Sequence, residues 1–110
     1  MRYLCILIMV GFLSVAFAVK AEDGKGIFDS LHCGICHKAD RGSAVTPSLK
    51  QIAGSYKGKE NQLLNYLKGE APSVINPKKG EKMERYIEKT KSLKEEQRKA
   101  LADFILSHGS

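Results

Sequence analysis

The residues best suited to chemistry are two cysteines and a histidine in the segment Cys33-Gly34-Ile35-Cys36-His37. Cys-x-x-Cys-His is the motif through which c-type haem is attached. The two intervening residues set the sulfurs at the separation of the two vinyl groups on one porphyrin edge, to which the thiols add. The next residue then turns its imidazole toward the iron. We therefore predict one covalent haem c, held by Cys33 and Cys36, with His37 as the proximal ligand.

The second axial ligand is predicted to be Met83. Six-coordinate electron carriers commonly use His/Met or His/His ligands, and methionine raises the reduction potential. Met83 is the one methionine left once residues 1–21 are removed. A lone methionine at helical spacing is usually a core gap-filler, but the haem motif favours ligation here. We expect His108, almost at the C-terminus, to be solvated, and His32, beside Cys33, not to reach the opposite haem face.

Residues 1–21 are expected to be a secretory signal peptide, followed by one domain at 22–110. A short cationic start precedes an apolar run, and small residues suit cleavage after Ala21 or Ala18. This predicts a periplasmic protein. The apolar run from Leu4 to Val19 is 16 residues long, whereas a bilayer span needs roughly 20. The membrane is therefore a partner only if the signal stays uncleaved.

Charge and length narrow the function classes. The whole chain has 18 basic and 12 acidic residues, and loss of Arg2 and Lys20 with the signal leaves 16 basic ones and a net charge of +4. A mildly basic protein suits partners with acidic surfaces. The lysines are interleaved with glutamates and not gathered with aromatic residues, so nucleic acid is not expected. A chain of this length is one domain and excludes a two-domain enzyme.

Three other interpretations of the motif are a plain disulfide with an incidental histidine, a thioredoxin-like redox pair and half a zinc site. Thioredoxin-like chemistry needs a strand–helix–strand context, and no segment here predicts a strand. Zinc needs a second ligand pair, and only His32 and His108 remain outside the motif. The export signal and the cysteine-free remainder of the mature chain favour haem over all three.

Hydrophobic periodicity predicts an all-α domain with four or five short helices. Helices this short are marginal alone, and about 89 residues bury only a modest core. A large apolar cofactor is therefore expected to hold them together. The expected helical segments are 22–31, 47–53, 60–68, 81–90 and 92–107.

Residues at the ends of these segments predict their caps. Thr46 is expected to cap the second segment, with Pro47 in its first helical position. Gly69 is expected to end the third. Ser92 and Glu95 have the spacing of a capping box and are expected to open the last segment.

Five segments carry a family resemblance: DGKGIF at 23–28, CGICH at 33–37, TPSL at 46–49, LKGEAP at 67–72 and ALADFILS at 100–107. With them the chain resembles the short bacterial class I cytochromes c, which are small periplasmic monohaem electron carriers. It is especially similar to those of thermophilic hydrogen- and sulfur-oxidising bacteria. The resemblance covers nearly all of residues 23–110 and implies the class I fold around one haem.

The resemblance also implies roles for single residues. Gly24 and Phe28 should face the last helix, so that the N- and C-terminal helices cross. The carbonyl of Pro47 should accept the Nδ1–H of His37, and Met83 should be the axial methionine.

Two positions depart from the family pattern. Thr46 stands where the family often has glycine before the proline. No proline adjoins Met83, so we expect a helix and not a proline-rich loop to present it.

Together these features predict a soluble one-electron carrier between respiratory complexes, and not an enzyme, because two axial ligands leave the iron no vacancy. Its expected partners are redox proteins with acidic docking surfaces, and we expect a monomer. One alternative is a haem c subunit of a larger sulfur-compound-oxidising or terminal oxidase complex. Another is a ligand-binding haem protein, if Met83 does not ligate.

Two further groups of side chains are expected near the haem. Four lysines are candidates for the rim of its exposed edge, and two tyrosines for hydrogen bonds to a propionate or for packing on the ring. They are Lys38, Lys78, Lys79 and Lys82, and Tyr56 and Tyr66.

Overall fold

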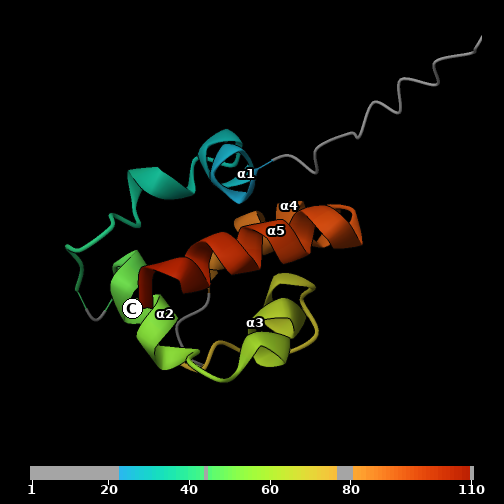
Figure 1. Cartoon of the computed structure of the whole chain (residues 1–110). Coiled ribbons are helices and arrows are strands. Elements are labelled where there is room, and N and C mark those ends of the chain that lie inside the picture. Colours follow the sequence, from blue (N-terminus) through green and yellow to red (C-terminus); the bar gives the residue numbers. More distant parts are fainter. Residues whose placement is uncertain (1–22, 44, 77–80, 110) are drawn as a thin grey trace, which may run out of the picture.

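The computed structural model describes residues 23–43, 45–76 and 81–109, so the predicted signal peptide lies outside the described residues. The described part is built from five α-helices and two short 3₁₀ helices and has no strand, which confirms the all-α prediction (Figure 1). None of its helices is long and apolar enough to cross a bilayer. In chain order they are α1 (Gly24–Ser30), η1 (Cys33–Ile35), α2 (Leu49–Ser55), α3 (Glu60–Leu67), α4 (Glu81–Lys91), α5 (Glu95–Leu106) and η2 (Ser107–Gly109).

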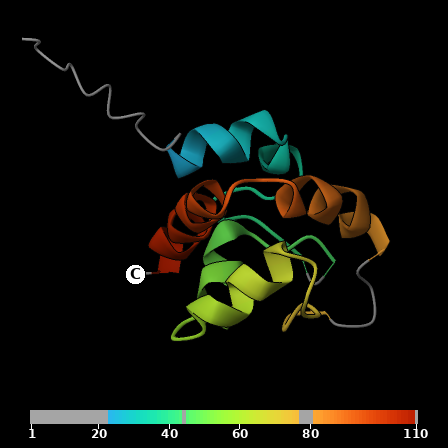
Figure 2. The same cartoon turned by 90° about the vertical axis from the view of Figure 1, so that its right-hand side faces the viewer.

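The first and last α-helices cross in close contact. Figure 1 shows α1 nearly end-on and α5 nearly side-on, and Figure 2 reverses the two views. At the crossing, the rings of Phe28 and Phe104 pack 5.3 Å apart between centroids, at an interplanar angle of 55°. Gly24 permits the approach, since a Cβ there would overlap the carbonyl oxygen of Ala100 and lie 2.7 Å from Phe104 Cβ. The crossing implied by the family resemblance is thus present.

Gly24→Ala is expected to lower the free energy of unfolding by about 3 kcal/mol, because the added methyl meets backbone that cannot move without separating the two helices. Gly26→Ala is the matched control. It lies on the same helix with nothing within 4 Å of a new Cβ, so it should stabilise the protein by about 0.5–1 kcal/mol. Guanidinium denaturation of the haem-loaded protein measures both. Equal effects of the two substitutions would contradict the close crossing.

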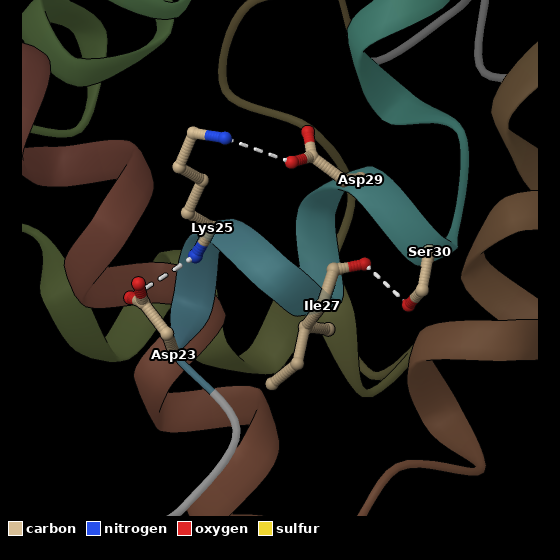
Figure 3. Close-up of polar contacts among 5 residues, drawn as sticks. All are labelled: Asp23, Lys25, Ile27, Asp29 and Ser30. Carbon is tan, nitrogen blue, oxygen red and sulfur yellow. Dashed lines mark hydrogen bonds and ion pairs between the residues drawn. The ribbon is translucent and has the colours of Figure 1, made fainter.

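Polar side chains support the exposed face of α1 (Figure 3). The carboxylate of Asp23 accepts the backbone N–H of Lys25 at 3.4 Å and caps the helix. The ammonium of Lys25 pairs with Asp29 at 3.0 Å, and the hydroxyl of Ser30 donates to the carbonyl of Ile27 at 2.9 Å. Exposed contacts of this kind stabilise a helix only modestly. The buried opposite face of α1 is what fixes it to the rest of the protein.

The start of α2 differs from the prediction, because Ser48 and not Thr46 is the cap. Ser48 Oγ accepts the N–H of Gln51 at 3.1 Å, and Gln51 Oε1 accepts the N–H of Ser48 at 2.7 Å. This reciprocal box satisfies two N–H groups at the helix start. The predicted Thr46–Pro47 start was two residues early, because Thr46 instead donates its N–H to the hydroxyl of Ser43 at 3.0 Å in the preceding loop.

The start of α5 also differs from the prediction, which placed a capping box at Ser92 and Glu95. The helix begins at Glu95, one residue after its cap, Lys94. The N–H of Lys94 donates to Gln97 Oε1 at 3.0 Å. The hydroxyl of Ser92 is used at the end of the previous helix, where it donates to the carbonyl of Glu88 at 3.1 Å. Ser92 therefore forms its hydrogen bond at the end of α4 and does not cap the start of α5.

The third helix ends as predicted, and the core is shared unevenly among the helices. Gly69 has a φ of +74°, the left-handed conformation that commonly follows a helix end. Helix α4 supplies one buried side chain among its described ones, the polar Thr90. The other four α-helices and Tyr56, just after α2, provide the apolar core: Ile27, Phe28, Leu49, Ala53, Tyr56, Leu63, Leu67, Leu101, Ala102 and Ile105.

Candidate haem site

The helices enclose an apolar cavity with an open mouth. Its empty volume is about 900 Å³, solvent at the mouth included. Side chains from all five α-helices line it. Four of the five predicted site residues are among them: Cys33, His37, Pro47 and Met83. Segments far apart in sequence thus meet at one cavity, as a haem pocket requires.

The cysteine motif folds as a tight turn that brings two of its reactive side chains to this cavity. The backbone N–H groups of Cys36 and His37 both donate to the carbonyl of Cys33, at 3.3 and 2.9 Å. The two cysteines are not joined to each other by a disulfide, and Cys33 is half-buried while Cys36 is exposed. Burial raises the pKa of the Cys33 thiol. His32, just before the turn, has a φ of 60°, is exposed and does not line the cavity.

The imidazole of His37 is held by the backbone. Its Nδ1 lies 2.7 Å from the carbonyl oxygen of Pro47, the contact that the family resemblance implied. A proton on Nδ1 makes this a hydrogen bond and leaves Nε2 free to bind a metal. Such a bond fixes the tautomer and the ring orientation and makes the imidazole a stronger ligand.

The Pro47 carbonyl is itself held in place by close packing. A Cβ at Gly42 would overlap the backbone nitrogen of Ser48 and lie 2.8 Å from the carbonyl carbon of Pro47. The N–H of Leu49 also donates to the carbonyl of Lys38 at 2.8 Å, which joins the start of α2 to the loop after the motif. A glycine is therefore required at position 42, because a side chain there would collide with the backbone of Pro47 and Ser48.

Gly42→Ala is expected to move the Pro47 peptide and weaken its bond to His37. We expect the Nδ1–H of His37 to exchange with solvent about tenfold faster, with stability lower by about 1–3 kcal/mol. Proton NMR of the reduced haem protein measures the exchange. Gly54→Ala is the control, since it lies in α2 with nothing within 4 Å of a new Cβ. Unchanged exchange in Gly42→Ala would show that Gly42 does not support this contact.

Met83 reaches the cavity from a helix, which is the presentation expected from its proline-free surroundings. It lies near the start of α4 and is half-buried. Tyr86 and Thr90, on the same helical face, line the cavity after it. The thioether of Met83 and the imidazole of His37 therefore belong to one lining, as a His/Met ligand pair requires.

The two candidate tyrosines both line the cavity. Tyr56 is 1% exposed, and its hydroxyl accepts the N–H of Val74 at 3.2 Å. It thereby holds the loop after α3 against the cavity, a role that the sequence did not suggest. Burial raises the pKa of Tyr66 to about 12, because the site disfavours the ionised form of its hydroxyl.

His108 is not the solvated residue that was expected. It is half-buried, because η2 continues α5 and turns the ring back onto Phe104. Its Nδ1 lies 2.9 Å from the carbonyl oxygen of Phe104, and the two rings meet edge to face, 4.9 Å apart. His108 is not part of the cavity lining and is not a candidate ligand.

The candidate lysines are described only in part. Lys38 lies beside the motif and donates to the carbonyl of Gly34 at 2.8 Å. Lys82 is exposed on the first turn of α4. The other two, Lys78 and Lys79, lie outside the described residues.

These residues fit a haem and not a zinc ion. The described residues hold no group of three or more His, Cys, Asp and Glu side chains able to bind a metal ion. They do offer two thiols at haem-attachment spacing, a backbone-held imidazole, a thioether and apolar walls. Fold and site together define an α-helical haem-binding domain.

Comparison with known proteins agrees with this class. The family model for cytochrome c matches residues 21–109, and no curated protein matches the chain. The chain therefore belongs to the cytochrome c family. It carries haem c attached covalently through Cys33 and Cys36, and members of this family are in general electron carriers and not enzymes.

Proposed function

We propose that this cytochrome c is a soluble periplasmic one-electron carrier between respiratory complexes, with its iron ligated by His37 and Met83. The observation that carries the proposal is the meeting of these two side chains at one apolar cavity. The backbone contact of His37 with Pro47 adds to it. With His37 and Met83 both bound to it, the iron would have no open site at which oxygen or peroxide could react.

The haem supplies a reversible Fe(II)/Fe(III) couple, and the chain's own residues adapt the site to it. His37 keeps its orientation through Pro47. The Met83 thioether is neutral and soft, so it suits both oxidation states. The buried, largely apolar lining excludes water and disfavours the additional charge of the oxidised iron. Methionine ligation and burial are among the factors that tune the reduction potential.

The surface around the motif supports docking of an acidic redox protein. Ile35 within the motif is 69% exposed, and Val45, which also lines the cavity, is 59% exposed. Lys38 lies three residues after Ile35, and the domain after the predicted signal has a net charge of +4. Exposed apolar side chains on a domain of net positive charge suit brief association that is steered by electrostatics and weakened by salt.

An absorption spectrum of the oxidised protein tests the proposal. We expect a far-red charge-transfer band from methionine to Fe(III), and no rapid binding of carbon monoxide after reduction. Absence of the band, with rapid cyanide or carbon monoxide binding, would indicate a ligand-binding haem protein instead. Size-exclusion chromatography of native extract distinguishes a free carrier from a subunit of a larger complex.

A further inference from the structure

Arg98 in α5 is a buried cation whose hydrogen bonds go to backbone. It is 7% exposed, and no ion pair to it occurs among the described residues. Its Nε donates to the carbonyl of Thr90 at 3.2 Å, and its Nη2 to those of Lys91 and Leu93 at 2.9 and 2.8 Å. The first two carbonyls belong to the last turn of α4. Arg98 therefore binds the C-terminal end of α4, where a cation also complements the helix dipole.

Thr90 extends this contact to a third helix. Its side chain is 3% exposed, and its hydroxyl lies 2.6 Å from the carbonyl oxygen of Leu67, the last residue of α3. The carbonyl of Thr90 accepts from Arg98 while its hydroxyl donates to Leu67. These two residues, hereafter the α4 anchor, join α5, α4 and α3 through buried hydrogen bonds.

Helix α4 has little else in the core to hold it. Thr90 is the single buried residue among its described side chains, and the others are exposed or half-buried. Met83 lies seven residues before Thr90, which is about two helical turns, or roughly 10 Å along the axis. Both side chains line the cavity. Because a helix moves as a rigid element, fixing one end of α4 fixes the position from which Met83 extends.

We propose that Arg98 and Thr90 are positioning residues for Met83. The α4 anchor keeps the thioether at the haem and so resists its replacement by an outside ligand. The inference rests on the proposed ligation by Met83. Loss of the anchor acts through the helix, with no change in any residue that contacts the iron.

The test compares the cyanide affinity of oxidised Arg98→Met and Thr90→Val with that of the wild type, under conditions in which circular dichroism shows every variant folded. Each substitution removes hydrogen bonding while nearly preserving side-chain size. We expect cyanide to bind about tenfold more tightly to both variants, which is a typical magnitude for the energetic coupling between two sites. Backbone amides of residues 83–91 should exchange about tenfold faster than in the wild type.

Gly24→Ala is the control for lost stability alone, since it disturbs the α1–α5 crossing away from α4. It should leave cyanide affinity within about twofold of the wild type. Unchanged cyanide affinity in both anchor variants, or an equal rise in Gly24→Ala, would overturn the positioning role. A wild-type protein without the far-red methionine band would instead overturn ligation by Met83, and the inference with it.

Discussion

Replacing Met83 with alanine will remove the far-red band of the oxidised protein and let carbon monoxide bind to the reduced iron. The reduction potential should fall by on the order of 0.1–0.2 V, part of the roughly 0.8 V range over which axial ligands set haem potentials. The physical reason is that a thioether stabilises Fe(II) relative to Fe(III), and water in its place does not. Absorption spectroscopy and a redox titration measure the three effects.

Ile87→Ala is the matched control for this prediction. Ile87 lies on the same helix, packs against the core and does not line the cavity. Its truncation should lower stability and leave both the band and the potential in place. If Met83→Ala kept the band and still excluded carbon monoxide, the band would not arise from Met83, some other group would have to occupy the iron, and the presentation of Met83 at the cavity would be incidental.

Replacing both cysteines with alanine will abolish covalent haem and with it most of the helical fold. The reason lies in the short helices and in the size of the cavity they enclose: α1 and α2 have seven residues each, and α3 has eight. Helices of this length do not persist alone in water. Mass spectrometry and far-ultraviolet circular dichroism of Cys33→Ala/Cys36→Ala, exported from cells that make haem c, measure the two losses.

Ile35→Ala is the control for this double variant, because it changes an exposed residue inside the motif and leaves both thiols. It should keep the mass of the bound haem and the full helical signal. A double variant that folded to wild-type helicity would show that the polypeptide core suffices without the attached group.

The attachment of haem could be predicted from the sequence because its signal is local: Cys33, Cys36 and His37 lie within five consecutive residues. Met83 could be named as the axial candidate because it is the single methionine of residues 22–110, and its ligation stays a prediction. The helices also followed from apolar spacing. The residues at which the helices start were harder to predict. Ser92 lies between two helices and its hydroxyl could bond to either, and only tertiary packing determines that it bonds at the end of α4.

The role of Arg98 could not be predicted, because its partners are backbone carbonyl groups. Every residue has one, so the sequence does not show which of them a side chain will meet. The sequence nevertheless contained an indication that Arg98 is buried. Arg98 shares its helix face with Leu101, Ala102 and Ile105, all of them buried. A cation on the apolar face of a helix needs buried acceptors. His108 was misjudged for a related reason, since its position near the chain end suggested solvent while η2 returned it to Phe104.

The mass of the purified protein tests most directly whether a haem is bonded to this chain. Intact-mass spectrometry under denaturing conditions should give the polypeptide 22–110, or 19–110 if cleavage follows Ala18, plus one haem, from a coloured sample. A colourless protein with the mass of the polypeptide alone would contradict the attachment at Cys33 and Cys36 and every function built on it.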